Sequence, residues 1–475
     1  MPKAKKIIDT GLLNIDQRDA FEELRTFISS KTDNSVYVLK GWAGTGKTFC
    51  ISFLINHVLN IMYPTNQKYK ISVTGPTNKS VRVIKKTSGI NSPRVTFQTI
   101  HKLLGLKERI TMDGRQEFVN DGESRPQISA VKLLVIDEVS MLNDELFNQI
   151  IKYRGRMKII CMGDPAQIPP VGKPDCIPFR DELAEAYCIK TISLRKVMRQ
   201  KEGNSIIDKS VRIRENLGGS HRIMDSETQL NNKGEGVEFL NLNLESVRSG
   251  FSDNLAKYFR TESFQNDPEF SKVIAWRNKT VNHMNSVIRK TIYGEESIGH
   301  KILVGEKLIA NGPIIQQGQI VLNTNDEFSV ESFEVKRENI SVEFNVGKRI
   351  VPIEYYNAEI SYLDDKDEEC YLTIEILHEN SEGDFDSIAK SLKNRAIESQ
   401  GKNRTWITYY NFLRRYADVS YSYAITAHKS QGSTYNTAFV LEDDIDANIN
   451  LVERDRIKYT AFTRASKKLY VLKRF

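Results

Sequence analysis

GWAGTGKT, at residues 41–48, is the most informative segment of this chain. It follows a β-rich run, SVYVLK at 35–40, and leads into an amphipathic stretch at 48–60. A strand, a glycine-rich turn and a helix, in that order, form a loop whose backbone N–H groups surround phosphate oxygens. We therefore predict a nucleotide phosphate site with these binding residues: Gly41, Gly44, Thr45, Gly46, Lys47 and Thr48.

A second apolar run ends in two acidic residues. LLVI at 133–136 is followed directly by Asp137 and Glu138. A carboxylate at the end of such a strand lies beside the phosphate loop, so Asp137 and the Thr48 hydroxyl are expected to hold Mg²⁺. Glu138 is placed to accept a proton from the attacking water. Lys47 is expected to put its charge on the β- and γ-phosphates. The expected cofactors are ATP and Mg²⁺.

The rest of the chain predicts an α/β fold with two units. Continuous apolar runs alternating with helical stretches are typical of a doubly wound parallel sheet, because helices cover both of its faces. In the first unit such runs lie at 71–74, 132–136 and 158–162. A second α/β unit is expected to begin near Thr191, to include KVIAW at 272–276 and to resume at Ser420.

Two segments interrupt this pattern. Residues 107–119 have strand-like halves around Asp113–Gly114, which predicts a β-hairpin that projects from the first unit. Short β-rich runs between about 300 and 380 predict a small inserted barrel, and 385–416 is expected to be helical. The expected divisions are 1–190 for the first unit, about 103–128 for its hairpin region, 191–475 for the second unit and about 290–418 for the insertion in it. The polar, glycine-rich stretch at 218–236 is expected to be a loop.

Composition excludes several classes of protein. Hydrophobic residues make up 40% and charged residues 27% of the 475 residues, with a net charge of +7. This is a normal composition for a soluble chain and is compatible with a nucleic-acid partner without requiring one. No apolar stretch is long enough to cross a bilayer, so no membrane partner is expected. The five cysteines are scattered without a C-x-x-C pair, which disfavours structural zinc and disulfides and fits a reducing compartment.

Further motifs stand in order along nearly the whole chain. They are NIDQRD (14–19), GPTNK (75–79), TIH (99–101), GDPAQ (163–167), VMR (197–199), AHKSQGST (427–434) and YTAFTRA (459–465). In order and spacing they resemble the motifs of superfamily 1 helicases, most closely the B-type branch with its RecD-, Pif- and phage Dda-type members. The resemblance implies two RecA-like lobes with ATP between them. It also implies that the hairpin is a strand-separating pin and the inserted barrel is SH3-like.

The resemblance assigns further residues to the nucleotide. Gln17 would recognise adenine, Gln167 would sense the γ-phosphate and Gly432 would contact the nucleotide from the second lobe. Arg199 and Arg464 would be arginine fingers, which stabilise charge on the γ-phosphoryl oxygens when the cleft closes. Trp42 departs from the family pattern, because small residues are commoner after the first glycine of the loop.

The resemblance also implies a single-strand path. Contacts to nucleic-acid phosphates are expected from Thr77, Lys79, Thr99 and Thr434. Contacts to the nucleic acid are also expected from Pro76, Asn78, His101 and His428. Phe97 and Trp276 could stack on bases, although isolated aromatic residues more often pack in a core. Phe118 on the hairpin could be a separation wedge or could pack the hairpin base. For His101 and His428, a structural hydrogen bond is an equal alternative.

The implied function is ATP-dependent DNA unwinding during 5′-to-3′ movement on a single strand, in replication, recombination or repair. Expected partners are single-stranded DNA, junctions of single and duplex DNA, and single-strand-binding or replisome proteins. The chain is expected to act as a monomer in the cytoplasm, or in a host's cytoplasm if it is phage-encoded. RNA stays open as an alternative strand.

Three rival functions remain. The first is a translocase that does not separate strands, and the second is a small-molecule kinase that turns over without nucleic acid. The third is a non-catalytic clamp or loader.

Overall fold

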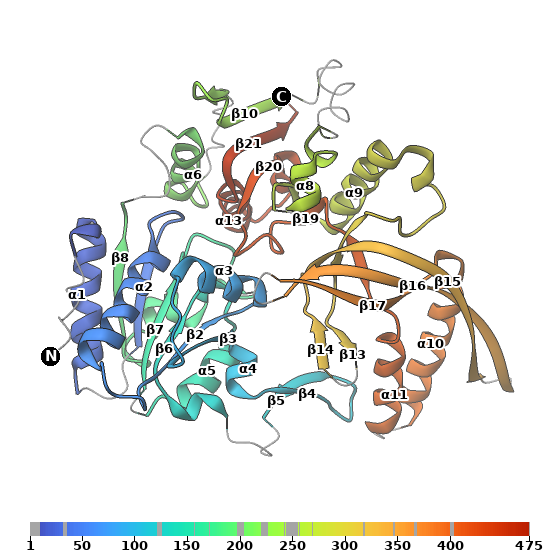
Figure 1. The fold of residues 1–475 in the computed structure, drawn as a ribbon, viewed down its shortest axis with the longest axis horizontal. Helices are drawn as coiled ribbons and strands as arrows, with labels where there is room; N and C mark the ends of the chain where they lie inside the picture. The colour runs from blue at the N-terminus through green and yellow to red at the C-terminus, as the bar shows by residue number, and fades with distance from the viewer. Residues whose placement is uncertain are drawn as a thin grey trace.

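A computed structural model gives the fold as two α/β lobes and an insertion (Figure 1). The described segments are 10–31, 36–120, 126–155, 157–170, 172–196, 204–219, 227–241, 243, 255, 257–267, 269–316, 319–344, 347–364, 368–399 and 403–474. The described residues begin in the first lobe and end in the second, and the insertion lies beside both (Figure 1).

The first lobe is built on a parallel six-stranded sheet in the order β3-β2-β6-β7-β1-β8. Its strands are β1 (Val36–Gly41), β2 (Lys70–Gly75), β3 (Val95–Thr99), β6 (Val131–Ile136), β7 (Lys158–Gly163) and β8 (Ile189–Leu194). Its helices are α1 (Ile15–Ser29), α2 (Lys47–His57), α3 (Asn78–Ser88), α4 (Ile100–Leu104) and α5 (Asp144–Lys152). A separate apolar core lies on each face of the sheet. The predicted buried parallel strands are therefore confirmed.

The boundary expected between residues 190 and 191 is wrong. It falls inside β8, which pairs in parallel with β1 from Val36–Ile189 to Gly41–Leu194. Because these backbone hydrogen bonds make β8 the edge strand of the first sheet, the first lobe extends to Leu194.

The second lobe has its own six-stranded sheet in the order β19-β11-β20-β21-β10-β9. Its strands are β9 (Gln229–Leu230), β10 (Gly236–Asn241), β11 (Ser271–Ala275), β19 (Ala424–Thr426), β20 (Tyr435–Leu441) and β21 (Ala465–Lys473). Its helices are α6 (Ser205–Glu215), α8 (Glu262–Asn266), α9 (Asn278–Tyr293), α12 (Glu442–Asp446) and α13 (Leu451–Phe462). The sequence predicts a loop at 218–236. In the described part of this segment, β9 instead forms an antiparallel pair with β10.

The insertion contains an antiparallel five-stranded sheet, β17-β16-β15-β12-β18, with an apolar core of its own. Its strands are β12 (Lys307–Ala310), β13 (Ile314–Gln316), β14 (Gln319–Leu322), β15 (Glu327–Phe344), β16 (Gly347–Leu363), β17 (Glu369–Leu377) and β18 (Val419–Tyr421). Helices α10 (Glu382–Glu398) and α11 (Asn403–Leu413) confirm the expected helical part. The expectation of only short strands is wrong, since β15 and β16 have 18 and 17 residues. The SH3-like identity of the insertion stays a prediction.

The hairpin of the first lobe reaches the insertion. Strands β4 (Lys107–Ile110) and β5 (Gln116–Val119) pair around the Asp113–Gly114 turn. At the turn, the Tyr410 hydroxyl of α11 donates to the Gly114 carbonyl at 2.6 Å. Along β4, Arg414 forms an ion pair with Glu108 at 2.6 Å. The hairpin is therefore fastened at its tip as well as at its base.

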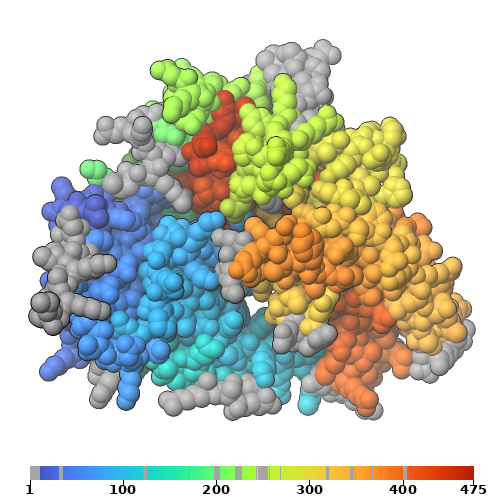
Figure 2. All heavy atoms as spheres, in the orientation of Figure 1, coloured from blue at the N-terminus to red at the C-terminus, as the bar shows by residue number. Residues whose placement is uncertain are grey.

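This contact closes a ring of protein. Figure 2 shows an opening bordered by the first lobe, the hairpin and the insertion. Among the described segments, no helix is long and apolar enough to span a membrane.

Candidate nucleotide cleft and nucleic-acid interface

The phosphate loop (residues 41–48) joins β1 to α2 and has the conformation that its glycines allow. Gly44 and Gly46 have φ angles of 80° and 77°, in the left-handed region that favours glycine. A Cβ on Gly46 would lie 2.5 Å from Nε2 of Gln17, so a side chain there would also collide. The loop ends at the N-terminus of α2, where free backbone N–H groups and the helix dipole favour an anion.

Lys47 lies across the loop. Its Nζ donates to the carbonyl oxygens of Gly41 at 2.9 Å and Trp42 at 3.2 Å. Oxygen ligands thus already hold the ammonium at the loop, and phosphate oxygens could replace them. Thr48 follows in the first turn of α2 and is half-buried. These residues fit a nucleotide phosphate.

Gln17 is hydrogen-bonded to the phosphate loop. Its Nε2 donates to the carbonyl of Thr45 at 3.0 Å, and its Oε1 accepts from the backbone N–H of Asn14 at 3.2 Å. The side chain is only 2% exposed. Both ends of the amide are therefore used within the protein, and recognition of adenine by Gln17 stays a prediction.

The acidic pair sits at the end of β6. The Asp137 N–H donates to the Thr74 carbonyl at 2.8 Å, which extends the pairing of β6 with β2 past the strand end. Glu138 has a φ of 49°, an uncommon left-handed conformation for a residue with a side chain. Such strain is often found where a side chain must be aimed at a functional site.

The charge of this pair suits a divalent cation. Burial, and next the charge of Glu138, raises the pKa of Asp137 well above its usual range. Mg²⁺ between Asp137, the Thr48 hydroxyl and phosphate oxygens would compensate that carboxylate. Within the described segments, no three His, Cys, Asp or Glu side chains gather to hold an ion alone. A bound cation would therefore depend on the nucleotide for ligands.

Gln167 lies in the turn that follows β7, which we call the sensor turn (residues 164–167). Its side chain is 4% exposed, and its buried Oε1 has no hydrogen-bond partner within the described structure. An unpaired buried amide oxygen costs free energy and marks a place where a ligand or water can complete the bonding. The position therefore suits the predicted sensor.

The structure describes one of the two predicted arginine fingers. Arg199 lies outside the described residues. Arg464 is buried in the second lobe, where its guanidinium donates to the carbonyl oxygens of Thr460 and Ser433, each at 3.0 Å. A role on the γ-phosphate would require those bonds to be exchanged, and it stays a prediction.

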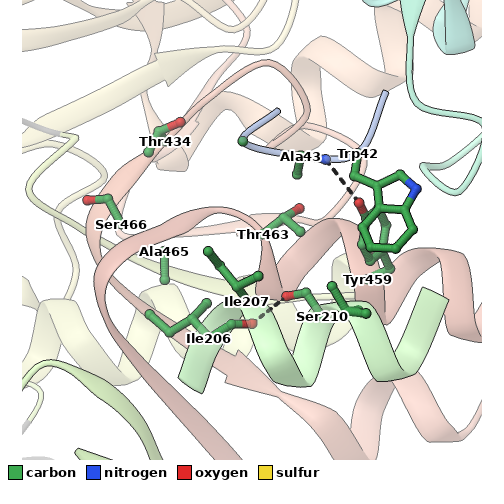
Figure 3. A pocket seen from close by; sticks show the side chains of 12 residues that line it. Trp42, Ala43, Ile206, Ile207, Ser210, Thr434, Tyr459, Thr463, Ala465 and Ser466 are labelled. Atoms are coloured by element: carbon green, nitrogen blue, oxygen red, sulfur yellow. Dashed lines mark hydrogen bonds between the residues drawn. The ribbon is translucent and has the colours of Figure 1, made fainter. Parts of the chain in front are cut away.

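The second lobe already touches the phosphate loop. The Ala43 N–H donates to the Tyr459 hydroxyl of α13 at 3.2 Å (Figure 3). That hydroxyl donates to the Asp164 carboxylate of the sensor turn at 2.6 Å. Burial and the charge of Asp164 raise the pKa of Tyr459, so the hydroxyl stays protonated. A cavity of about 110 Å³ lies between the loop and the second lobe, with Thr434 in its lining.

The sequence did not predict how closely the lobes approach here. Gly432 faces the first lobe, since a Cβ on it would lie 3.5 Å from Cβ of Ser80. Gln431 also crosses the cleft, because its Nε2 donates to the Ile168 carbonyl at 3.0 Å. Tyr459 and Asp164 lay within quoted motifs, but Arg214, which pairs with Asp164, had no motif to mark it.

The expected nucleic-acid segments of the first lobe are brought together by the sheet. Strands β2 and β3 are neighbours, so 75–79 and 99–101 follow adjacent strand ends. Thr77 and Thr99 cap α3 and α4, accepting from the N–H groups of Ser80 and Lys102. Pro76 and Asn78 are half-buried beside the Thr77 cap.

Lys79 differs most from the expectation of a phosphate contact. Its ammonium pairs with Glu269 of the second lobe at 3.0 Å and with Glu327 of the insertion at 3.6 Å. In this structure Lys79 therefore links three parts of the protein. A phosphate contact stays a prediction and requires those ion pairs to be exchanged.

The expected aromatic contacts are mostly packed in the protein. Phe97 packs against the core of the first lobe, and Trp276 against that of the second. The Phe118 ring lies edge-on to His101, with ring centres 5.1 Å apart, yet 47% of the residue is exposed. The ring can therefore pack the hairpin base and still present one side to solvent. Burial lowers the pKa of His101 and of His428, so both favour the neutral form.

The chain matches two protein families. Residues 12–230 match an AAA domain, and residues 421–472 match a UvrD-like helicase C-terminal domain. Together with the ordered motifs, these matches support a resemblance to the B-type, RecD/Pif-like branch of superfamily 1 helicases, and they identify the chain as an ATP-hydrolysing enzyme of the helicase class.

Particular relatives cover nearly the whole chain. It is 23% identical to the ATP-dependent DNA helicase dda of Enterobacteria phage T4, over 94% of this chain and 96% of that protein. It is 24% identical to the RecBCD enzyme subunit RecD of Buchnera aphidicola, over 92% of this chain and 70% of that protein. A crystal structure of Bacteroides Pif1 helicase with ADP-AlF3 and single-stranded DNA covers 95% of this chain and 91% of its own, with 18% identity and a TM-score of 0.47.

Proposed function

We propose that the chain moves along single-stranded DNA in the 5′-to-3′ direction and uses ATP hydrolysis to unwind duplex DNA. The observation that carries this proposal is the direct contact of the second lobe with the phosphate loop and sensor turn, through Tyr459. Relative motion of the lobes must change the surroundings of the residues that handle ATP. The relatives of similar length include one named as an ATP-dependent DNA helicase.

In the proposed mechanism each residue has a limited task. Lys47 neutralises phosphate charge, and Glu138 orients the attacking water and accepts its proton. Gln167 contacts the γ-phosphate, so the sensor turn responds to the presence of that phosphate. When bound, Mg²⁺ would balance charge on the phosphate oxygens near Thr48 and Asp137. Arg464 would complete the charge balance when the cleft closes. The resemblance to helicases assigns the same task to Arg199.

Closure needs contacts that differ between the open and closed states. Phosphate contacts on the two lobes would then tighten in alternation and move the strand. Such contacts provide affinity without sequence readout, so a motor on any sequence is expected.

Strand separation is assigned to the hairpin. Its anchorage on α11 by Tyr410 and Arg414 gives a fixed edge beside the opening of Figure 2. We assign the path of the single strand to that opening. We also propose that the insertion is an SH3-like domain. A translocase without strand separation would need no such fixed edge.

The test compares duplexes with a 5′ or a 3′ single-stranded tail. The proposal predicts ATP-dependent separation of the 5′-tailed duplex and little separation of the 3′-tailed one. The reverse preference would contradict the direction. ATP hydrolysis stimulated by single strands but without separation of either duplex would favour the translocase. Matched RNA strands identify the preferred nucleic acid.

A further inference from the structure

Arg214, near the end of α6, reaches from the second lobe to the first. Its guanidinium forms an ion pair with Asp164 of the sensor turn, and the two side chains are 15% and 0% exposed. The centre of the guanidinium lies 5.2 Å from the Trp42 ring and 5.6 Å from the Tyr459 ring. One side chain thus touches the phosphate loop, the sensor turn and α13.

Asp164 depends on the second lobe for two of its three hydrogen-bond donors. A fully buried carboxylate is costly unless it is paired and hydrogen-bonded. Asp164 accepts from Arg214 and, at 2.6 Å, from the Tyr459 hydroxyl. Its third donor is the N–H of Ala166, at 3.0 Å in its own turn. The Asp164 carbonyl accepts from the Gln167 N–H at 3.1 Å, so Asp164 also fixes the turn that carries the sensor.

The phosphate loop is held by the same two second-lobe residues. Tyr459 accepts from Ala43, as Figure 3 shows. Arg214 lies against Trp42, and a guanidinium near an aromatic face is attracted by the ring. The unusual Trp42 thereby gains a role, because a small residue at that place would offer Arg214 no ring. Any change in the spacing of the lobes acts on both first-lobe segments at once.

We propose that Arg214 is a positioning residue that transmits movement of the second lobe to the phosphate loop and the sensor turn. It would thereby couple strand binding to ATP turnover. Its role is distinct from that expected of Arg199 and Arg464, because it acts on protein groups and not on the nucleotide. The inference rests on the proposed function, since it requires DNA to stimulate hydrolysis.

The first experiment measures steady-state ATPase against single-stranded DNA concentration for Arg214→Ala, Arg214→Lys and the control Arg212→Ala. Arg212 is exposed on the same helix. Arg214→Ala is expected to reduce DNA stimulation of kcat about tenfold, within the usual range of coupling between sites. The DNA concentration for half-maximal rate should stay unchanged. DNA stimulation of Arg214→Lys should fall between that of the wild type and that of Arg214→Ala, because an ammonium keeps the charge but not the planar contact with Trp42.

The double variant Arg214→Ala/Asp164→Asn separates coupling from stability. It removes the buried carboxylate that Arg214→Ala leaves unpaired, so it should recover thermal stability without recovering DNA stimulation. Recovery of stimulation together with stability would overturn the proposal, because Arg214 would then only stabilise the fold. Stimulation of Arg214→Ala equal to that of Arg212→Ala would also overturn it. An unstimulated wild type would instead overturn the proposed function, and the inference with it.

Discussion

Replacing Gly114 by alanine tests whether the anchored hairpin tip is needed for strand separation. A Cβ on Gly114 would lie 2.6 Å from ring atoms of Trp406, a side chain that is only 9% exposed. Overpacking of this kind costs about 1–3 kcal/mol. Since about 1.4 kcal/mol is a tenfold change in an equilibrium constant, docking of the tip on α11 should weaken roughly 5- to 150-fold.

The remaining tip contacts are of about the same size as that loss. The hydrogen bond from Tyr410 to Gly114 contributes about 0.5–1.5 kcal/mol. The ion pair of Arg414 with Glu108 is partly exposed and contributes about 0–1 kcal/mol. The Gly114→Ala hairpin should therefore spend much of its time away from α11, and unwinding should slow by about tenfold, within the range estimated for docking.

The assay measures unwinding of a 5′-tailed duplex and DNA-stimulated ATPase on the same preparation. Gly234→Ala is the matched control. Gly234 has a φ of 74° against 80° for Gly114, but nothing lies within 4 Å of its added Cβ. Both alanines therefore have a similar unfavourable φ, and only Gly114→Ala clashes. An equal ratio of unwinding to ATPase in the two variants would show that the docked tip is not needed for strand separation. Parallel loss of both activities in Gly114→Ala alone would show the same.

Three further substitutions test individual assignments. Lys47→Ala should lower ATPase by about a hundredfold or more, because the phosphate charge loses its ammonium; near-normal turnover by the folded variant would remove Lys47 from the site. Glu138→Gln should still bind nucleotide but hydrolyse it about a hundredfold more slowly; loss of binding, measured with a fluorescent ATP analogue, would contradict the role as base. Phe118→Ala should slow unwinding about tenfold, since base–aromatic stacking contributes roughly 1–3 kcal/mol. If Phe118 only packs against His101, ATPase and unwinding should fall together.

Local sequence was enough to predict the first half of the site. The strand, glycine turn and helix at 35–60 are determined by neighbouring residues, and the structure has them as β1, the phosphate loop and α2. Asp137 and Glu138 follow a buried strand for the same reason. A glycine-containing turn between two short strands also predicted the hairpin at 107–119.

Features that depend on distant partners could not be predicted this way. The membership of β8 in the first sheet is decided by pairing with β1, far back in the chain. The long strands β15 and β16 carry exposed polar residues that break the apolar pattern, while their mutual pairing continues past them.

Side-chain contacts across the cleft could not be predicted from local sequence either. Lys79 belongs to a motif that suggests a phosphate contact, yet Glu269 and Glu327 occupy its ammonium from other parts of the fold. Arg214 lies in no motif, and only the folded chain brings it to Asp164. Motifs therefore indicated where the chemistry lies, but they did not predict which residues tie the lobes together.

In the proposed motor, ATP hydrolysis is coupled to a nucleic-acid strand. The most direct measurement is the ATPase rate of the full chain as single-stranded DNA is added, at several salt concentrations. The rate should rise to saturation, with half-saturation moving to higher DNA concentration as salt increases, because phosphate contacts release counterions. A rate that is the same with and without single strands, at every salt concentration, would rule out a strand-driven motor and favour a small-molecule kinase.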